Sequence, residues 1–214
     1  VGLQSLMGIS QNLSELNWER YQSWTSNFSP DLAREAVYSF KGDTYTGLDA
    51  DSLKEKDIIF AQDNVRILSG LYGILKPLDL MLPYRLEMGT RLENKNGKNL
   101  YEFWGDSLSE TISSELDTHK DKVVINCASN EYFKSIDNEA LGVSVITPEF
   151  KEIKNGKTRM ISFFAKKARG MMARFIVENR IDFSEQILDF NMAGYKFDQS
   201  LSSQGKPVFT RIQP

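Results

Sequence analysis

The spacing of apolar residues changes about half-way along the chain, and this change limits the possible fold more than any other feature. Before residue 120, apolar residues recur mostly at helical spacing. After it come short apolar runs typical of strands, and Asn155-Gly156 is the strongest short signal for a hairpin. The chain therefore predicts an α+β (mixed α/β) fold. Since it has no Pro- or Gly-rich linker, one domain over residues 1–214 is expected.

The same patterns predict where the elements lie. Helical spacing is found in four segments of the first half: 13–24, 31–40, 57–68 and 101–116. The glycines of segment 41–47 predict a loop. In the second half, a basic helix is expected over 165–180. Strands are expected over 123–128, 143–153, 158–164, 195–197 and 207–212.

Composition excludes several classes of protein. With one cysteine, Cys127, and one histidine, His119, the chain can form neither a disulfide framework nor a site with two imidazole ligands. Its apolar runs are too short to span a membrane, and no secretory signal opens it. A cytoplasmic protein without a metal or cofactor is expected. Because Val1 is not a methionine, an upstream segment is expected to be missing.

Positive charge is concentrated in one stretch of an otherwise acidic chain. The formal net charge is −3, from 26 Lys and Arg against 29 Asp and Glu. Residues 151–180 nevertheless contain nine basic residues and only two acidic ones. Because the local field steers an anionic partner more than the average charge does, this stretch predicts contact with a polyanion such as nucleic acid.

The basic helix predicted over 165–180 has an apolar side and a basic side. At about 100° per residue, one arc holds Ala168, Met171, Met172, Phe175 and Ile176. Gly170 and Ala173 lie within the basic side, where a phosphate backbone could approach closely. The cations of that side are Lys166, Lys167, Arg169, Arg174 and Arg180. An ordinary amphipathic surface helix with solvated cations remains the alternative.

A second candidate phosphate site is the turn Gly70-Leu71-Tyr72-Gly73, which follows the helical-looking segment 65–68. Two glycines near a helix–helix turn can expose backbone N–H groups to an oxyanion. A helix-hairpin-helix element holds a DNA backbone in this way. A C-cap glycine followed by a plain turn fits the spacing equally well.

Carboxylates near turns leave an enzyme as an alternative; they are Asp43, Asp79, Glu87, Asp106 and Glu131. In a basic cleft with Tyr45, a carboxylate such as Asp43, Asp106 or Glu131 could act as general base on a nucleotide or a nucleic-acid end. Direct iron binding by carboxylates is a third hypothesis. Cys127 follows an apolar strand and is expected to be an inert core residue.

Several motifs taken together resemble one protein family. They are FKGDTYTGL (40–48), LSGLYGILKPLDL (68–80), PYRLEMG (83–89), YEFWGD (101–106), NEYFKS (130–135) and ISFFAKKARG (161–170). In this order and with these gaps, they resemble the YaaA family of bacterial peroxide-stress-resistance proteins. The resemblance extends from about residue 1 to the C-terminus.

The resemblance implies a cytoplasmic protein that limits peroxide damage, lowers loosely held iron and binds DNA in a basic cleft. It also implies an unusual single-domain α/β fold with a helix-hairpin-helix element, whose residues by position are Ser69, Gly70, Tyr72, Gly73 and Lys76. Charge and motif position predict as cleft residues Lys41, Arg85, Arg91, Lys134, Lys166, Lys167, Arg169 and Arg174. Family members begin with a strand and a Ser-Pro-Ala-Lys-Thr-like loop about forty residues upstream of Val1, so part of the cleft is expected to be absent.

Overall fold

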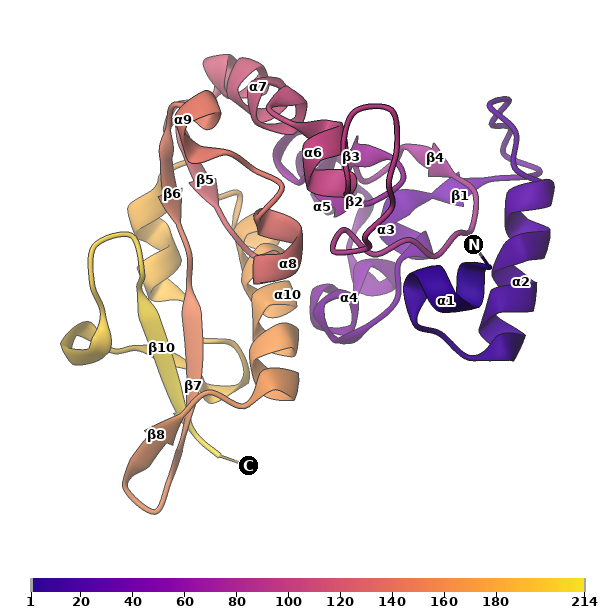
Figure 1. Ribbon diagram of the computed structural model, residues 1–214. Coiled ribbons are helices and arrows are strands. Elements are labelled where there is room, and N and C mark those ends of the chain that lie inside the picture. Colours follow the sequence, from indigo (N-terminus) through magenta and orange to yellow (C-terminus); the bar gives the residue numbers. More distant parts are fainter. Residues whose placement is uncertain (1, 214) are drawn as a thin grey trace.

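The first 118 residues are mainly helical. The computed structural model describes residues 2–213 (Figure 1). The α-helices of this part are α1 (Leu3–Met7), α2 (Gln11–Gln22), α3 (Ala36–Ser39), α4 (Asp43–Leu48), α5 (Glu55–Asn64), α6 (Leu100–Trp104) and α7 (Ser107–Glu115). Short 3₁₀ turns lie at η1 (Ala50–Ser52) and η2 (Leu116–Thr118). The helix predicted over 13–24 is confirmed by α2, whose Ser10 side chain caps it by accepting from the N–H of Leu13.

Two short antiparallel strand pairs connect these helices. β1 (Arg34–Glu35) pairs with β4 (Leu80–Met81), and β2 (Ile67–Ser69) pairs with β3 (Gly73–Leu75). In both strands of the second pair the outer residues are buried and the middle residue is less so. This alternation is that of a strand with one side facing a core.

Several predictions for this half are wrong, two of them because strand pairing overrides local helical propensity. Segment 31–40 is not one helix, since 34–35 pair with β4. Segment 41–47 is not a loop, since α4 begins at Asp43. The helix predicted over 57–68 ends at Asn64, before β2. Gly105, at φ 48°, divides the helix predicted over 101–116 into α6 and α7.

The second part of the chain contains a four-stranded sheet in the order β8-β7-β10-β9. Its strands are β7 (Glu149–Lys154), β8 (Lys157–Arg159), β9 (Lys196–Phe197) and β10 (Val208–Ile212). β7 and β10 are parallel, and the outer strands are antiparallel to them. β5 (Val123–Ile125) and β6 (Ser144–Ile146) form a separate parallel pair. The other elements are α8 (Asn130–Phe133), α9 (Asn138–Leu141), α10 (Ser162–Asn179), η3 (Ser184–Asp189), η4 (Met192–Gly194) and η5 (Gln199–Leu201).

The predicted α+β fold is confirmed, and so is the hairpin at Asn155-Gly156. These residues have φ values of 51° and 71°, and positive φ at both central positions is what a type I′ hairpin turn requires. Boundaries differ from the prediction at several elements, and the main differences concern the predicted strands 143–153 and 158–164. Segment 143–153 is divided at Pro148, which has no N–H to donate, and β8 ends at Arg159 because α10 already begins at Ser162.

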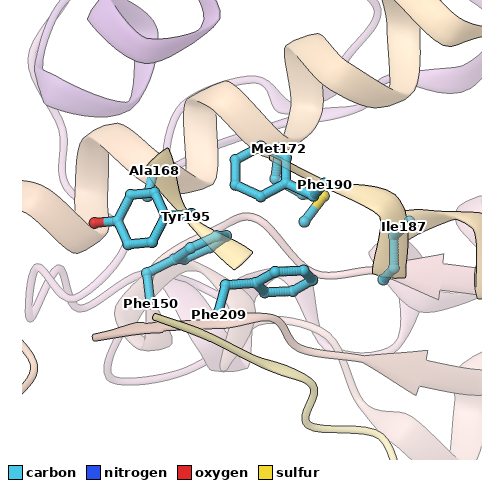
Figure 2. Close-up of a cluster of buried hydrophobic side chains, with 7 residues drawn as sticks. All are labelled: Phe150, Ala168, Met172, Ile187, Phe190, Tyr195 and Phe209. Atoms are coloured by element: carbon cyan, nitrogen blue, oxygen red, sulfur yellow. The ribbon is translucent and has the colours of Figure 1, made fainter. Parts of the chain in front are cut away.

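An aromatic core fixes α10 on this sheet. Seven buried side chains meet between them (Figure 2): Phe150, Ala168, Met172, Ile187, Phe190, Tyr195 and Phe209. The rings of Phe150 and Phe209, on neighbouring strands, stack with centroids 5.5 Å apart. Fully burying a Phe side chain contributes about 1.5–3 kcal/mol of transfer free energy. The orientation of α10 is therefore set by its apolar side, and its basic side points away from the sheet.

Candidate nucleic-acid interface

The strip of small residues on α10 is buried against α4. A Cβ atom at Gly170 would lie 1.8 Å from the carbonyl oxygen of Thr44, and one at Gly47 would lie 2.0 Å from the carbonyl oxygen of Lys167. Glycine at both positions therefore lets the two helix backbones touch. The prediction that this strip is open to a phosphate backbone is wrong, because α4 fills it.

Two arginines of α10 are held by the protein itself. Arg174, whose side chain is 14% exposed, donates to the carbonyl oxygen of Asp49 at 2.9 Å and pairs with Glu178 at 2.8 Å. Arg169 donates to the carbonyl oxygen of Ala128 at 3.0 Å, which connects α10 to the segment after β5. Both guanidinium groups therefore join elements of the fold.

The lone cysteine packs against the aromatic core beside Arg169. Burial raises the pKa of the Cys127 thiol to about 12, although the neighbouring Arg169 lowers it. A thiol with this pKa is protonated at neutral pH and is a poor nucleophile. This agrees with the prediction that Cys127 is an inert core residue.

The segment expected to form a helix-hairpin-helix element is a β-hairpin. The turn after Ser69 connects β2 with β3 instead of connecting two helices, so that prediction is wrong. Ser69 is fully buried, with its hydroxyl 2.5 Å from that of Tyr84 and accepting from the N–H of Tyr72 at 2.9 Å. The backbone of Gly70 lies against the carbonyl group of Leu86, 2.4 Å from where a Cβ atom would be. This turn is thus covered by the chain around Leu86.

The remaining residues of this turn are also engaged. Gly73, at φ 73°, lies under the Trp104 ring, where a Cβ atom would be 2.8 Å from two ring carbons. Lys76 pairs with Glu115 at 3.1 Å. The hydroxyl of Tyr72 accepts a hydrogen bond from the Trp24 indole N–H at 3.1 Å and contacts the backbone of residue 82. The turn is part of the interior packing of the first half.

Four cations predicted to line a cleft are exposed: Lys41, Arg85, Arg91 and Lys134. The ammonium of Lys134 lies 5.1 Å from the centre of the Tyr101 ring. Arg85 is neutralised by Glu87 at 2.6 Å. Arg91 makes no ion pair with any residue in the described range 2–213.

The candidate carboxylates do not line one common cavity. Asp106 lines a cavity of about 460 Å³ between α6, α8 and α9, and neither Asp43 nor Glu131 lines it. Glu131 accepts a hydrogen bond from the N–H of Gly89 at 3.0 Å, and Asp43 lies in the first turn of α4. Among residues 2–213, no group of three or more His, Cys, Asp or Glu side chains is placed to hold a metal ion.

One group of cations that are close together in the sequence has no carboxylate partner within the described residues 2–213. We call it the hairpin–α10 surface; it consists of Lys154, Lys157, Arg159, Lys166 and Lys167. Within residues 2–213 none of them lies within 4.0 Å of a carboxylate oxygen. The carboxylates of β7 have other partners, since Glu149 pairs with Lys151 at 3.0 Å and Glu152 with Arg211 at 2.8 Å. In Figure 1 the β7–β8 hairpin and the first turns of α10 lie at the same end of the sheet.

The sequence identifies only part of this surface. It predicts Lys166 and Lys167 individually as binding residues, but it includes the three cations of the hairpin only as part of the basic stretch 151–180. The excess of basic residues in that stretch is the signal that contains all five cations, and the sequence does not show which of its cations have carboxylate partners.

Comparison with protein families decides which family this is. The model of a family described as peroxide stress protein YaaA matches residues 2–201. The chain belongs to the YaaA family. The motifs that resemble the YaaA family contact one another in the structure, because Gly47 of FKGDTYTGL meets Gly170 of ISFFAKKARG, and Gly70 meets Leu86.

A YaaA-family protein acts in the response to peroxide stress. The described part of this chain contains no helix that is both long and apolar enough to cross a bilayer. The five cations of the hairpin–α10 surface lie within the residues that the YaaA family model matches.

Proposed function

We propose that this peroxide-stress protein binds DNA through phosphate contacts made by the hairpin–α10 surface. The observation that carries the proposal is its group of five cations without carboxylate partners. Lys and Arg side chains that are not already neutralised release counterions when they contact a nucleic-acid backbone, and this release is the main source of sequence-independent affinity.

The composition of the surface favours backbone contacts over base reading. Four of its five cations are lysines, whose ammonium group acts as a point charge, whereas the planar fork of arginine is better suited to the bidentate recognition of a base edge. Arg174 is left out of the proposal because its guanidinium is engaged within the protein, and Arg169 because its guanidinium is fixed to the carbonyl oxygen of Ala128 and its Nε is buried. The glycine turn is left out because the chain around it covers it. Little sequence preference is expected.

We infer that protection against iron-dependent damage follows from the same contacts. Ferrous ions can be held at DNA as counterions of the phosphates, and protein cations that neutralise phosphates release such counterions. The protein then acts in the cytoplasm, where bacterial DNA lies, and needs no iron ligand of its own. Strand breaks that ferrous iron and peroxide cause in a plasmid should decrease when the protein is bound.

The test is a triple variant, Lys157→Ala, Arg159→Ala and Lys166→Ala, compared with the unaltered chain. Fluorescence anisotropy with labelled duplexes of several sequences, repeated across a salt series, measures affinity and its salt dependence. We expect affinity to fall for all sequences alike, and the slope of log K against log salt to decrease by about three. The same variant should lose the protection of the plasmid.

A matched control replaces three other exposed lysines, Lys56, Lys95 and Lys206, by alanine. It changes the net charge equally but leaves the hairpin–α10 surface intact. Equal losses of affinity in both triple variants would show that only net charge matters. Unchanged affinity in the first variant would contradict the proposal that the hairpin–α10 surface binds DNA.

A further inference from the structure

Two large apolar side chains stand among the cations of the hairpin–α10 surface. Met160 is 58% exposed and Phe163 is 54% exposed. Arg159 directly precedes Met160, and Lys166 and Lys167 follow Phe163 by three and four residues on α10. Residues at these helical spacings share one face, so the Phe163 ring and two ammonium groups lie on the same side of the helix.

The exposed ring is supported from within the protein. Phe163 packs against Phe164 with ring centroids 5.5 Å apart and an interplanar angle of 62°. Phe164 in turn contacts Arg211, whose guanidinium lies 4.9 Å from the centre of the Phe164 ring. Arg211 is held in place by the buried carboxylate of Glu152. Phe163 is therefore a ring with a packed neighbour and a free surface, next to unpaired cations.

The pairing of a free aromatic face with unpaired cations fits one class of ligand. A nucleotide offers a phosphate to the cations and a flat base to the ring, and stacking of bases on aromatic side chains depends little on sequence. In a duplex the base faces are covered by their neighbours, so a duplex offers only phosphates. An unpaired strand offers both groups at once.

We propose that Phe163 stacks on an unpaired base and that the hairpin–α10 surface thereby prefers single-stranded over double-stranded DNA. This inference rests on the proposed function, because the cations must hold the backbone before a base can reach the ring. It adds a specific role for a side chain that carries no charge.

The test compares Phe163→Ala with Phe183→Ala. Phe183 is also exposed, at 47%, but it lies outside the hairpin–α10 surface, and Asp182 and Glu185 beside it in the sequence are acidic. The probes are labelled oligothymidine, a duplex of the same length, and a strand of the same length made of abasic sites. Vesicles with an anionic lipid serve as a further probe, because a ring among lysines can also enter a membrane surface.

We expect Phe163→Ala to weaken binding of oligothymidine by about 5- to 100-fold, the range of one lost stacking contact. Binding of the duplex and of the abasic strand should change by less than twofold, Phe163→Tyr should retain the affinity, and Phe183→Ala should have no effect.

The outcomes separate the two proposals. If the unaltered chain binds both forms of DNA and the triple lysine and arginine variant loses both, but Phe163→Ala still binds oligothymidine normally, stacking is wrong and the proposed function stands. If no nucleic acid binds at low salt, both proposals fail. If Phe163→Ala changes only the binding of anionic vesicles, the ring belongs to a membrane contact and the stacking role is overturned.

Discussion

At the scale of single residues, a buried ion pair holds the two central strands of the sheet together. Glu152 on β7 is 2% exposed and accepts from the Nε of Arg211 on β10 at 2.8 Å. The hydroxyl of Tyr195 donates to the same carboxylate. Removing one partner of a buried pair leaves the other charge uncompensated, which typically costs about 3–5 kcal/mol.

We therefore expect Glu152→Gln to lower the free energy of unfolding by about 3 kcal/mol, measured by urea denaturation. Glu149→Gln on the same strand is the control. Its ion pair with Lys151 is 3.0 Å long and more than a quarter exposed on both sides, so its loss should cost less than about 1 kcal/mol. Equal effects of the two substitutions would contradict the structural role given to Glu152.

A second residue, Asp57, makes stability depend on pH. A hydrogen bond from Arg180 at 2.7 Å lowers the pKa of Asp57 below its usual value. A carboxylate whose pKa is lower in the folded state stabilises the protein above its unfolded-state pKa, near about 4, and this stabilisation is lost as the pH falls further. Asp57→Asn should therefore reduce the loss of stability on acidification, followed as the urea midpoint from pH 6 to pH 3. The unaltered chain, measured over the same pH range, is the reference, and an equal loss of stability in both proteins would contradict the role given to Asp57.

At the scale of elements, the β7–β8 hairpin presents three cations of the proposed surface, so its turn controls their position. Gly156→Val places a β-branched residue at φ 71°, where such residues are strained by about 1–2 kcal/mol. We expect the hairpin end to fray and DNA affinity to fall severalfold at low salt. Asn155→Gly keeps a residue that adopts positive φ without strain and should bind normally. Normal binding by Gly156→Val would mean that the hairpin cations do not take part.

The elements also show what the sequence can and cannot predict. Asn155-Gly156 determined its hairpin because a type I′ turn depends on the two residues themselves. Segment 65–76 was not predictable as a hairpin, because Ile67 and Leu75 of its strands are buried against Ala36, a residue about thirty positions earlier in the chain. Gly170 was recognised as a bare position, but that α4 fills it depends on Gly47, more than one hundred residues away. The local excess of basic residues identifies the basic stretch, whereas the ion pairs that neutralise Arg174 are visible only in the structure.

At the scale of the whole molecule, α4 and α10 connect the helical first part to the sheet. The backbones touch at Gly47 and Gly170, and Arg174 reaches from α10 to the carbonyl group of Asp49 after α4. Arg180 likewise reaches Asp57 on α5. The aromatic core fixes the sheet to α10. Because of these contacts, a substitution that lowers the stability of one part is expected to lower the stability of the other part as well.

For the substitution Gly170→Ala, helix propensity and packing predict opposite changes in the free energy of unfolding. Alanine stabilises a helix interior by up to about 1 kcal/mol relative to glycine, but a Cβ atom at Gly170 would lie 1.8 Å from the Thr44 carbonyl oxygen and 2.7 Å from the Leu48 nitrogen. Separating the helices by overpacking costs about 1–3 kcal/mol, so Gly170→Ala should lower the free energy of unfolding.

All three tryptophans, at positions 18, 24 and 104, lie in the first part, so their fluorescence follows the unfolding of that part alone. Hydrogen exchange at β7 and β10 follows the sheet. Both should report the same lowered stability in Gly170→Ala, whereas Lys166→Ala on the same helix should leave both unchanged; a loss confined to one part would show that α4 and α10 do not couple them.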